Sequence, residues 1–357
     1  MKRRWRIAAA IGGVAAVLVL TALAYIELGC RSPLAPDVLP KPFTGGSPLS
    51  AAERRPGPRT FLTYPEWHIV YEADAFGRYL ASGAPPSGFA YGRWIGSFWT
   101  SYCAVNRATR GSEAAGDAKV TIYTIGISYT VELAVKATYE RTIGRVFEWA
   151  SGWRSADDRH AAQVQVRYGA FLHETPWYRF PFGDALRGLW RTREPDRTAR
   201  HWERRAALTA EYAVKAGYAK AIDAATGATV GRDDTTLRFV TTADAATIRA
   251  IDPRLKPVRA LAGGGLVVEA PRYQQFNALL GKLAVANVPL VEIAGNRTIF
   301  ATLLLPDGAA HAPAIFAMPA DRDGWQRIGV AVAVPEVPAL LRDTRRTGGV
   351  VEHVYDY

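Results

Sequence analysis

One ten-residue pattern occurs twice in this chain and constrains its fold more than any other feature. Residues 130–139 read TVELAVKATY and residues 209–218 read TAEYAVKAGY. In a helix, side chains three and four positions apart lie on the same side. The pattern therefore predicts two similar helices, each with a carboxylate, an amine and a phenol on one side. These candidate ligand-binding residues are Glu132, Lys136 and Tyr139 in the first copy and Glu211, Lys215 and Tyr218 in the second.

The similarity extends upstream of both copies. A helical segment ending at Leu80 is followed by a connector rich in proline and aromatic residues, and then by a short segment ending at Trp99. A second helical segment ends at Leu172 and is followed by a similar connector and a short segment ending at Trp190. We therefore predict a helical domain of two tandem units over residues 60–224.

Two units with the same polar stripe can pack about a pseudo-twofold axis, so that Glu132 and Lys136 approach Glu211 and Lys215. Three interpretations remain open for this layer. The charged residues can form solvated ion pairs that stabilise each helix, a buried polar layer that holds an acidic or polar ligand, or a catalytic group. A buried and paired charge is compatible with function and with fold specificity.

The N-terminus predicts a membrane anchor. Residues 1–6 form a basic tail, and an uncharged run from Ile7 to Ile26 is long enough to cross a bilayer as a helix. We expect residues 7–28 to be a transmembrane anchor or a cleaved signal segment, with the basic tail in the cytoplasm and the rest outside it. The expected location is the inner membrane, single-pass, with the bulk of the chain periplasmic or otherwise extracytoplasmic.

Residues 29–59 are rich in proline and predict an extended stalk. The chain carries a net charge of +11, and a basic domain at a membrane attracts anionic headgroups or polymers. The expected topology and the lack of a recognisable binding motif argue against a nucleic-acid partner. The expected partners are the membrane, through the N-terminal helix, and a small molecule or a protein.

Residues 225–357 have a different composition, with β-branched apolar runs and few tryptophans. The pattern predicts strands at 236–241, 265–269, 289–293, 298–305, 328–334 and 350–355, and helices at 271–286 and 337–345. A turn at Gly295-Asn296 predicts a hairpin between the third and fourth strands. The fold class is α+β, with a C-terminal ferredoxin-like domain that has an extra strand.

Candidate catalytic chemistry is sparse. Two cysteines, Cys30 and Cys103, provide no disulfide framework, and Cys103 in its aromatic surroundings predicts a buried apolar residue. His68, His173 and His201 lie one or two positions from carboxylates, whereas metal-binding helices use spacings of three or four. The three histidines are candidate ligand-binding residues if their segments converge. We expect no metal and no cofactor, because no phosphate loop and no nucleophilic serine motif is present.

Several segments resemble those of uncharacterised bacterial proteins that have an N-terminal membrane span and no established activity. The resemblance covers most of residues 60–300. It implies a bacterial envelope setting and carries no catalytic residue across. The segments are YPEWHIVYE (64–72), FWTSYCAV (98–105), TYERTIGRVFEW (138–149), PWYRFPF (176–182), WERR (202–205), EYAVKAGY (211–218), PRYQQF (271–276) and VEIAGN (291–296).

Two functions from different classes follow. The first is a membrane-tethered envelope protein that binds a ligand or a partner. The alternative is a hydrolase-like envelope enzyme that uses the Glu/Lys/Tyr layer together with one of the histidines. An enzyme predicts that Glu132 or Glu211 meets one of these histidines in a concave pocket.

Overall fold

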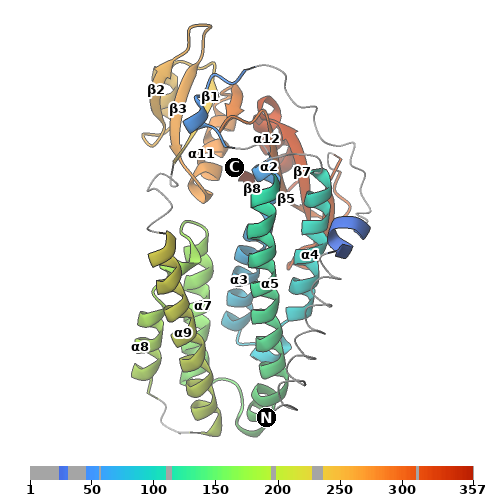
Figure 1. The fold of residues 1–357 in the computed structure, drawn as a ribbon, viewed down its shortest axis with the longest axis vertical. Helices are drawn as coiled ribbons and strands as arrows, with labels where there is room; N and C mark the ends of the chain where they lie inside the picture. Colours follow the sequence, from blue (N-terminus) through green and yellow to red (C-terminus); the bar gives the residue numbers. More distant parts are fainter. Residues whose placement is uncertain are drawn as a thin grey trace, which may run out of the picture.

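The computed structural model describes residues 24–30, 46–55, 58–109, 115–193, 198–226, 236–310 and 313–356. Helices form one end of the molecule and antiparallel sheets with two long helices form the other (Figure 1). The fold class is α+β, as the sequence predicted. Most of the predicted anchor (residues 7–23) lies outside the described residues. Within the described ranges, no helix is both long enough and apolar enough to cross a membrane.

Two helical units follow one another in the chain, and each consists of a long helix, a short 3-10 turn, a helix and a second long helix. A π-helical segment and a short helix join the units. The first unit contains α3 (Tyr64–Ala81), η4 (Pro86–Gly88), α4 (Tyr91–Ala108) and α5 (Ala115–Tyr139); the link contains η5 (Glu140–Gly144) and α6 (Arg145–Ser151); the second unit contains α7 (Ala156–Leu172), η6 (Trp177–Arg179), α8 (Phe182–Arg191) and α9 (Ala199–Thr226).

Equivalent contacts recur in both units. His68 Nε2 lies 3.2 Å from the carbonyl oxygen of Trp94, and His160 Nε2 lies 2.9 Å from that of Ala185. The indole of Trp99 donates to Thr130 at 2.9 Å, and the indole of Trp190 donates to Thr209 at 3.1 Å. These pairs connect the same positions of the two units, so the predicted duplication is present in the tertiary contacts as well as in the sequence.

The two units cross at glycines. A Cβ at Gly77 of α3 would lie 3.1 Å from the Cα of Val166 in α7, and a Cβ at Gly169 of α7 would lie 3.2 Å from the Cα of Asp74 in α3. Gly77 and Gly169 are equivalent positions, so the crossing is reciprocal about a pseudo-twofold axis. The missing side chains allow the two helix backbones to approach closely.

The C-terminal region contains two four-stranded antiparallel sheets, with strand orders β2-β3-β1-β4 and β6-β7-β5-β8. The two orders are the same when strands are numbered within each sheet. The bounds are β1 (Thr236–Thr241), α10 (Ala245–Ile251), β2 (Lys256–Ala260), β3 (Leu266–Pro271), α11 (Gln274–Val285), β4 (Leu290–Ile293), β5 (Thr298–Pro306), β6 (Phe316–Pro319), β7 (Trp325–Ala333), η8 (Val334–Glu336), α12 (Val337–Arg346) and β8 (Val350–Tyr355).

The predicted single sheet with one extra strand is therefore wrong. The prediction lacked β2 and β6, which are edge strands that contain proline (Pro257 and Pro319) and so lack a strong strand pattern. The predicted hairpin at Gly295-Asn296 is also wrong. β4 pairs with β1 while β5 pairs with β7 and β8, so this turn passes from one sheet to the other.

The apolar core crosses the predicted domain boundary. Side chains of α3 and α4 share one buried cluster with Phe300, Phe316 and Tyr355 of the second sheet. Thr60 fixes this contact, because its hydroxyl donates to the carbonyl of Tyr355 at 2.6 Å and accepts from the amide of Phe300 at 2.9 Å. The second sheet and the first helical unit are thus packed as one body.

Two predictions for the N-terminal region need correction. Cys30 and Cys103 form a disulfide, so Cys103 is not a free apolar residue. Part of the predicted stalk is also packed against the first sheet. Leu49 is buried there, and Glu53 pairs with Arg238 and Arg259. The proline-rich composition did not reveal these docking contacts.

Candidate ligand-binding site

A pocket of about 500 Å³ lies where the helical units meet the first sheet domain. Its walls come from α3, from the end of α7, from the turn after α10 and from the start of α11, so four parts of the chain contribute. We call it the interdomain pocket. It is lined by Asp74, Ala170, His173, Glu174, Arg254, Gln274, Gln275 and Ala278. The size is typical of a small-molecule site, although the lining is more polar than usual.

An aspartate–histidine pair stands at one wall. His173 Nε2 lies 2.5 Å from Asp74 Oδ2, and both side chains are about one-fifth exposed. Gly169, one turn before His173, makes room for this carboxylate, since a Cβ there would lie 2.5 Å from Asp74 Oδ1. The contact orients the imidazole and leaves its Nδ1 available for another partner.

A stacked layer supports this wall from behind. Trp67 contacts the ring of His173 edge-on at 5.7 Å and lies 3.7 Å from the ring centroid of His353. Asn277 of α11 lies 2.6 Å from His353 Nδ1 and accepts from the amide of Val354. Burial, reinforced by His173 and Arg272, holds the pKa of His353 well below its usual value, so this ring is neutral.

The part of the lining that comes from the first sheet region carries a positioned guanidinium group. Arg254 donates to both oxygens of Asp252, at 2.9 and 3.0 Å, and Asp252 also accepts from Lys282 at 2.8 Å. The side chain of Arg254 is 43% exposed, so it remains accessible to a ligand. The pocket therefore offers a cation and the carboxylates of Asp74 and Glu174.

The predicted meeting of the duplicated stripes is confirmed. Lys136 donates to Glu211 at 3.1 Å, and Lys215 pairs with Glu132 at 2.8 Å. We call these four residues the seam. Burial would raise the pKa of Glu211, but Lys136 and Lys215 outweigh it and lower that pKa well below its usual value. The seam residues are paired with each other, which favours the interpretation that they hold the units together.

A fifth ionisable group lies beneath the seam. Glu72 of α3 is only 7% exposed. Burial raises its pKa to about 8; the ammonium groups of Lys136 and Lys215 oppose this shift, while Glu132 and Glu211 add to it. The repeat gave no signal for Glu72, because the equivalent position of the second unit is Val164.

The two tyrosines of the repeat have diverged. Tyr139 donates to Glu203 at 2.5 Å, whereas Tyr218 is 53% exposed and packs against Trp177 at 5.3 Å. Within the part of the chain that the structure describes, neither tyrosine is hydrogen-bonded to a seam residue. The Glu/Lys/Tyr layer that the sequence predicted is thus a Glu/Lys seam with its tyrosines directed to other partners.

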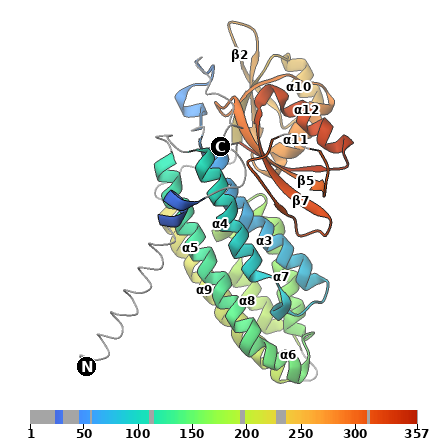
Figure 2. The same ribbon diagram turned by 90° about the vertical axis from the view of Figure 1, so that its right-hand side faces the viewer.

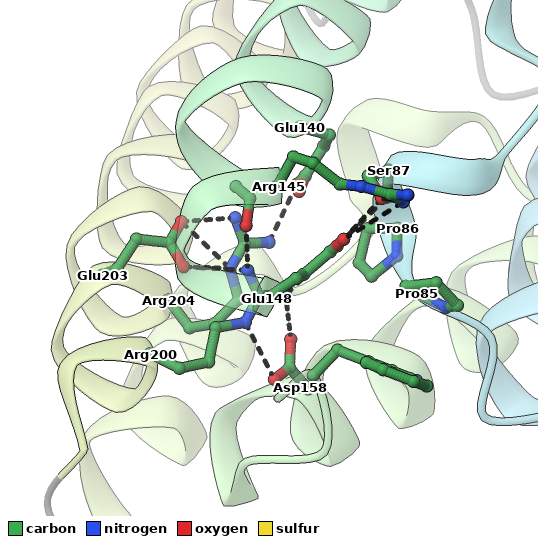
Figure 3. Close-up of polar contacts among 12 residues, drawn as sticks. Pro85, Pro86, Ser87, Glu140, Arg145, Glu148, Asp158, Arg200, Glu203 and Arg204 are labelled. Atoms are coloured by element: carbon green, nitrogen blue, oxygen red, sulfur yellow. Dashed lines mark hydrogen bonds and ion pairs between the residues drawn. The ribbon is translucent and has the colours of Figure 1, made fainter. Parts of the chain in front are cut away.

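A second buried network closes the far end of the helical domain (Figure 3). Arg200 of α9 binds Asp158 at 2.8 Å and Glu203 at 3.0 Å. Arg204 binds Glu203 and reaches Glu140 of the π-helical segment at 2.8 Å. Burial raises the pKa of Glu140 despite Arg204. Arg200 and Arg204 are each shared between carboxylates, so the network locks the second helical unit to the π-helical link.

Sequence reasoning missed this network, although several of its charged residues lie close together in two short segments. The acids Glu140 and Glu148 lie in the segment TYERTIGRVFEW, and Glu203 and Arg204 lie in WERR. The spacing of these buried charged residues does not follow helical periodicity, so it did not predict which of them pair.

The three candidate histidines do not converge. His68 is fully buried and lies near the backbone of Trp94, and burial, with help from Arg327, lowers its pKa to about 3. His201 is buried 3.1 Å from Asp157. His173 alone of the three lines the interdomain pocket. Among the described residues, no group of three or more potential ligands is arranged to hold a metal ion.

The seam and the histidines are also separate. The acids Glu132 and Glu211 bind lysines rather than a histidine, so the arrangement that the enzyme hypothesis required is not formed by these residues.

Comparison with protein-family profiles, curated proteins and solved structures gives no match to this chain.

Proposed function

We propose that this chain is a membrane-tethered protein of the bacterial envelope that binds a small polar ligand in the interdomain pocket. The observation that carries the proposal is that the Asp74–His173 pair and Arg254 line the same pocket of about 500 Å³. A ligand with both an anionic group and hydroxyl or amine donors matches this lining. The anion would contact Arg254, and the donors would contact Asp74 or Glu174.

The compartment is supported by the cysteines. Cys30 and Cys103 are the two cysteines of the chain, and they are bonded to each other. Disulfides persist in oxidising compartments and are rare in the cytosol. Together with the basic tail and the apolar run from Ile7 to Ile26, the disulfide supports an extracytoplasmic location with the N-terminus as a single-pass inner-membrane anchor.

The same proposal includes the fold of the two C-terminal sheets. Each C-terminal sheet has the strand order of the split β-α-β arrangement, so we propose that both are ferredoxin-like modules, the second without its first helix. The likeness to uncharacterised bacterial membrane-anchored proteins agrees with this setting and adds no activity.

A thermal-shift screen of full-length protein in detergent tests the binding proposal. The probes are amino acids, short oligosaccharides and sugar phosphates. We expect at least one compound to raise the melting temperature of the wild type, and this shift to be lost in Asp74→Asn and His173→Gln. Arg78→Ala is the matched control, because Arg78 lies one turn from Asp74 on α3 but its side chain is 64% exposed. A shift that persists in both pocket variants would contradict the site.

One observation favours a second candidate, the hydrolase-like enzyme. An imidazole oriented by a carboxylate is a competent general base for activating water, and Asp74 and His173 have this relation. If the enzyme alternative holds, activity toward a panel of ester and amide substrates should vanish in His173→Gln. Binding without turnover by the wild type would leave the binding proposal in place.

A further inference from the structure

Large apolar side chains are unevenly distributed on the molecular surface. Seventeen of them are exposed among the described residues, and eleven belong to residues 24–30, the α5–η5–α6 rod or α9. By contrast, three lie on the whole C-terminal region. Concentrated apolar exposure of this kind marks an interaction surface. The eleven are Tyr25, Leu28, Val120, Val131, Val135, Ile143, Val146, Trp149, Trp202, Val214 and Tyr218.

The outward sides of α5 and α9 form two stripes of apolar and small side chains, with Lys220 as an exposed charge near the end of α9. Each stripe follows helical spacing over several turns, and α5 and α9 both lie on one side of the helical region, which faces the viewer in Figure 1 and forms the left-hand edge in Figure 2. The α5 stripe is about 27 Å long at 1.5 Å per residue. We call the two stripes together the α5–α9 face. It consists of Val120, Thr124, Ile127, Ser128, Val131, Ala134, Val135 and Thr138 on α5, and Trp202, Ala206, Ala210, Ala213, Val214, Gly217, Tyr218 and Ala221 on α9.

The hydroxyl groups on this face do not need water. Thr124 donates to the carbonyl of Val120 at 2.9 Å, and Thr138 donates to that of Ala134 at 2.8 Å. Ser128 likewise donates to a carbonyl of its own helix. Back-bonding of this kind lets serine and threonine leave water without an unsatisfied donor.

The charges near the face suit an anionic surface. Its two acids, Glu132 and Glu211, are neutralised by the lysines of the seam. At one end, Arg145 is 64% exposed and Trp149 is 88% exposed. Tryptophan and arginine prefer the level of the lipid headgroups, where an apolar body and a polar tip are both accommodated.

The residues that follow the predicted anchor pack directly against α4 and α5. The apolar run ends at Ile26, which is buried, and Glu27 pairs with Lys119 of α5 at 3.1 Å and accepts from Tyr123 at 2.7 Å. Cys30 is then bonded to Cys103 of α4. No spacer separates the anchor from α4 and α5, so an anchor in the bilayer holds these helices at the membrane surface.

We propose that the α5–α9 face lies on the lipid bilayer of the membrane that holds the anchor. This inference rests on the proposed membrane tether. A domain held this close to the membrane by its own chain presents a mainly apolar face whose acids are paired with lysines and whose end is aromatic and basic. These are the features of a surface that sits at the headgroup–acyl boundary. The predicted stalk would instead have kept the domain away from the bilayer.

Environment-sensitive fluorescence on full-length protein in proteoliposomes tests the proposal. Single cysteines at Val131→Cys and Val214→Cys are labelled with a nitrobenzoxadiazole dye, because the native cysteines are occupied in the disulfide. Vesicles contain phosphatidylethanolamine and phosphatidylglycerol, with or without brominated phosphatidylcholine. The matched control is Val285→Cys on α11, whose native side chain is 67% exposed compared with 56% and 71% at the test positions.

We expect blue-shifted emission at positions 131 and 214, with most of the intensity lost in brominated vesicles and no comparable change at position 285. If positions 131 and 214 behave as position 285 does, the face is in water and the proposal fails. A blue shift without quenching also overturns it, because another protein surface, such as the apolar run or a second copy, then covers the face.

Alkaline carbonate washing of the same vesicles keeps the two proposals apart. Retention of the protein supports the membrane tether whatever the dyes report. Release of the protein refutes the tether, while quenching in unwashed vesicles still decides whether the face contacts lipid. Unchanged melting temperatures of the labelled variants verify that the substitutions have not unfolded the domain.

Discussion

At the scale of single residues, Glu72 breaks the symmetry of the duplicated units. It is buried beneath the seam, while its counterpart Val164 is apolar and equally inaccessible. Burial raises the pKa of Glu72 to about 8, so the carboxyl holds its proton at neutral pH. A protonated carboxyl costs far less to bury than a carboxylate. One of the two units thus contains a proton that titrates just above neutrality.

Replacing this carboxyl should change stability in a pH-dependent way. A carboxyl whose pKa is about 8 when folded and 4.5 when unfolded destabilises the protein progressively as pH rises between these values. Glu72→Gln should therefore have little effect near pH 4.5 and raise the free energy of unfolding by on the order of 4 kcal/mol above pH 8. Chemical denaturation across this range measures the effect.

The control is Glu132→Gln, which removes a half-exposed seam partner of Lys215 and should lower stability instead. An equal stabilisation by Glu72→Gln at low and high pH would show that its carboxyl does not titrate in the expected window.

At the scale of elements, the seam was the feature most accessible to sequence reasoning. The spacing of Glu and Lys in two copies of one pattern determines which side of each helix they occupy, and the duplication determines that the sides meet. The reciprocal pairs Lys136–Glu211 and Lys215–Glu132 follow from these two facts. The Arg200–Glu203–Arg204 network was not accessible, because it depends on the π-helical segment, which no periodicity signals.

The two lysines of the seam should not contribute equally. Lys215 contacts two carboxylates, Glu132 at 2.8 Å and Glu211 at 3.0 Å, whereas Lys136 contacts Glu211 and lies over the ring of Phe76. Their side chains are 17% and 19% exposed, between the buried and the surface case. We expect Lys215→Met to cost about 2 kcal/mol and Lys136→Met about 1 kcal/mol.

Urea unfolding monitored by tryptophan fluorescence gives both values, and added salt should reduce the difference. Losses well below 1 kcal/mol in both variants would mean that the seam behaves as a solvated surface pair.

At the scale of the whole molecule, sequence reasoning gave the order of the regions but not their contacts. The change in residue composition after the helical units predicted an α+β region, and six of its strands were expected. Its division into two sheets depends on the proline-containing edge strands β2 and β6, whose patterns are weak. The interdomain pocket joins α3, α7 and α11, and only His173 among its lining residues was a candidate, because convergence of distant segments leaves no local pattern.

The disulfide ties the N-terminal segment to the helical units across 73 residues. Closing a loop of this length removes chain entropy from the unfolded state, with an expected stabilisation of about 4 kcal/mol. The double variant Cys30→Ser/Cys103→Ser should lose most of this stabilisation, and reduction of the wild type should produce a similar loss. Protein isolated from the envelope should show no maleimide-reactive thiol before reduction.

Equal stability of the oxidised and reduced protein would contradict a structural role for this bond. A reactive thiol in the protein as isolated would contradict the extracytoplasmic location as well, because both native cysteines are used in the bond.

The reciprocal seam also gives the two units the relation of two subunits. Each lysine binds a glutamate of the other unit, and the glycine crossing of α3 and α7 is reciprocal in the same way. Such exchanged contacts are those of a twofold homodimer. The two units of one polypeptide therefore meet as the two subunits of such a dimer do, through the same contacts made twice.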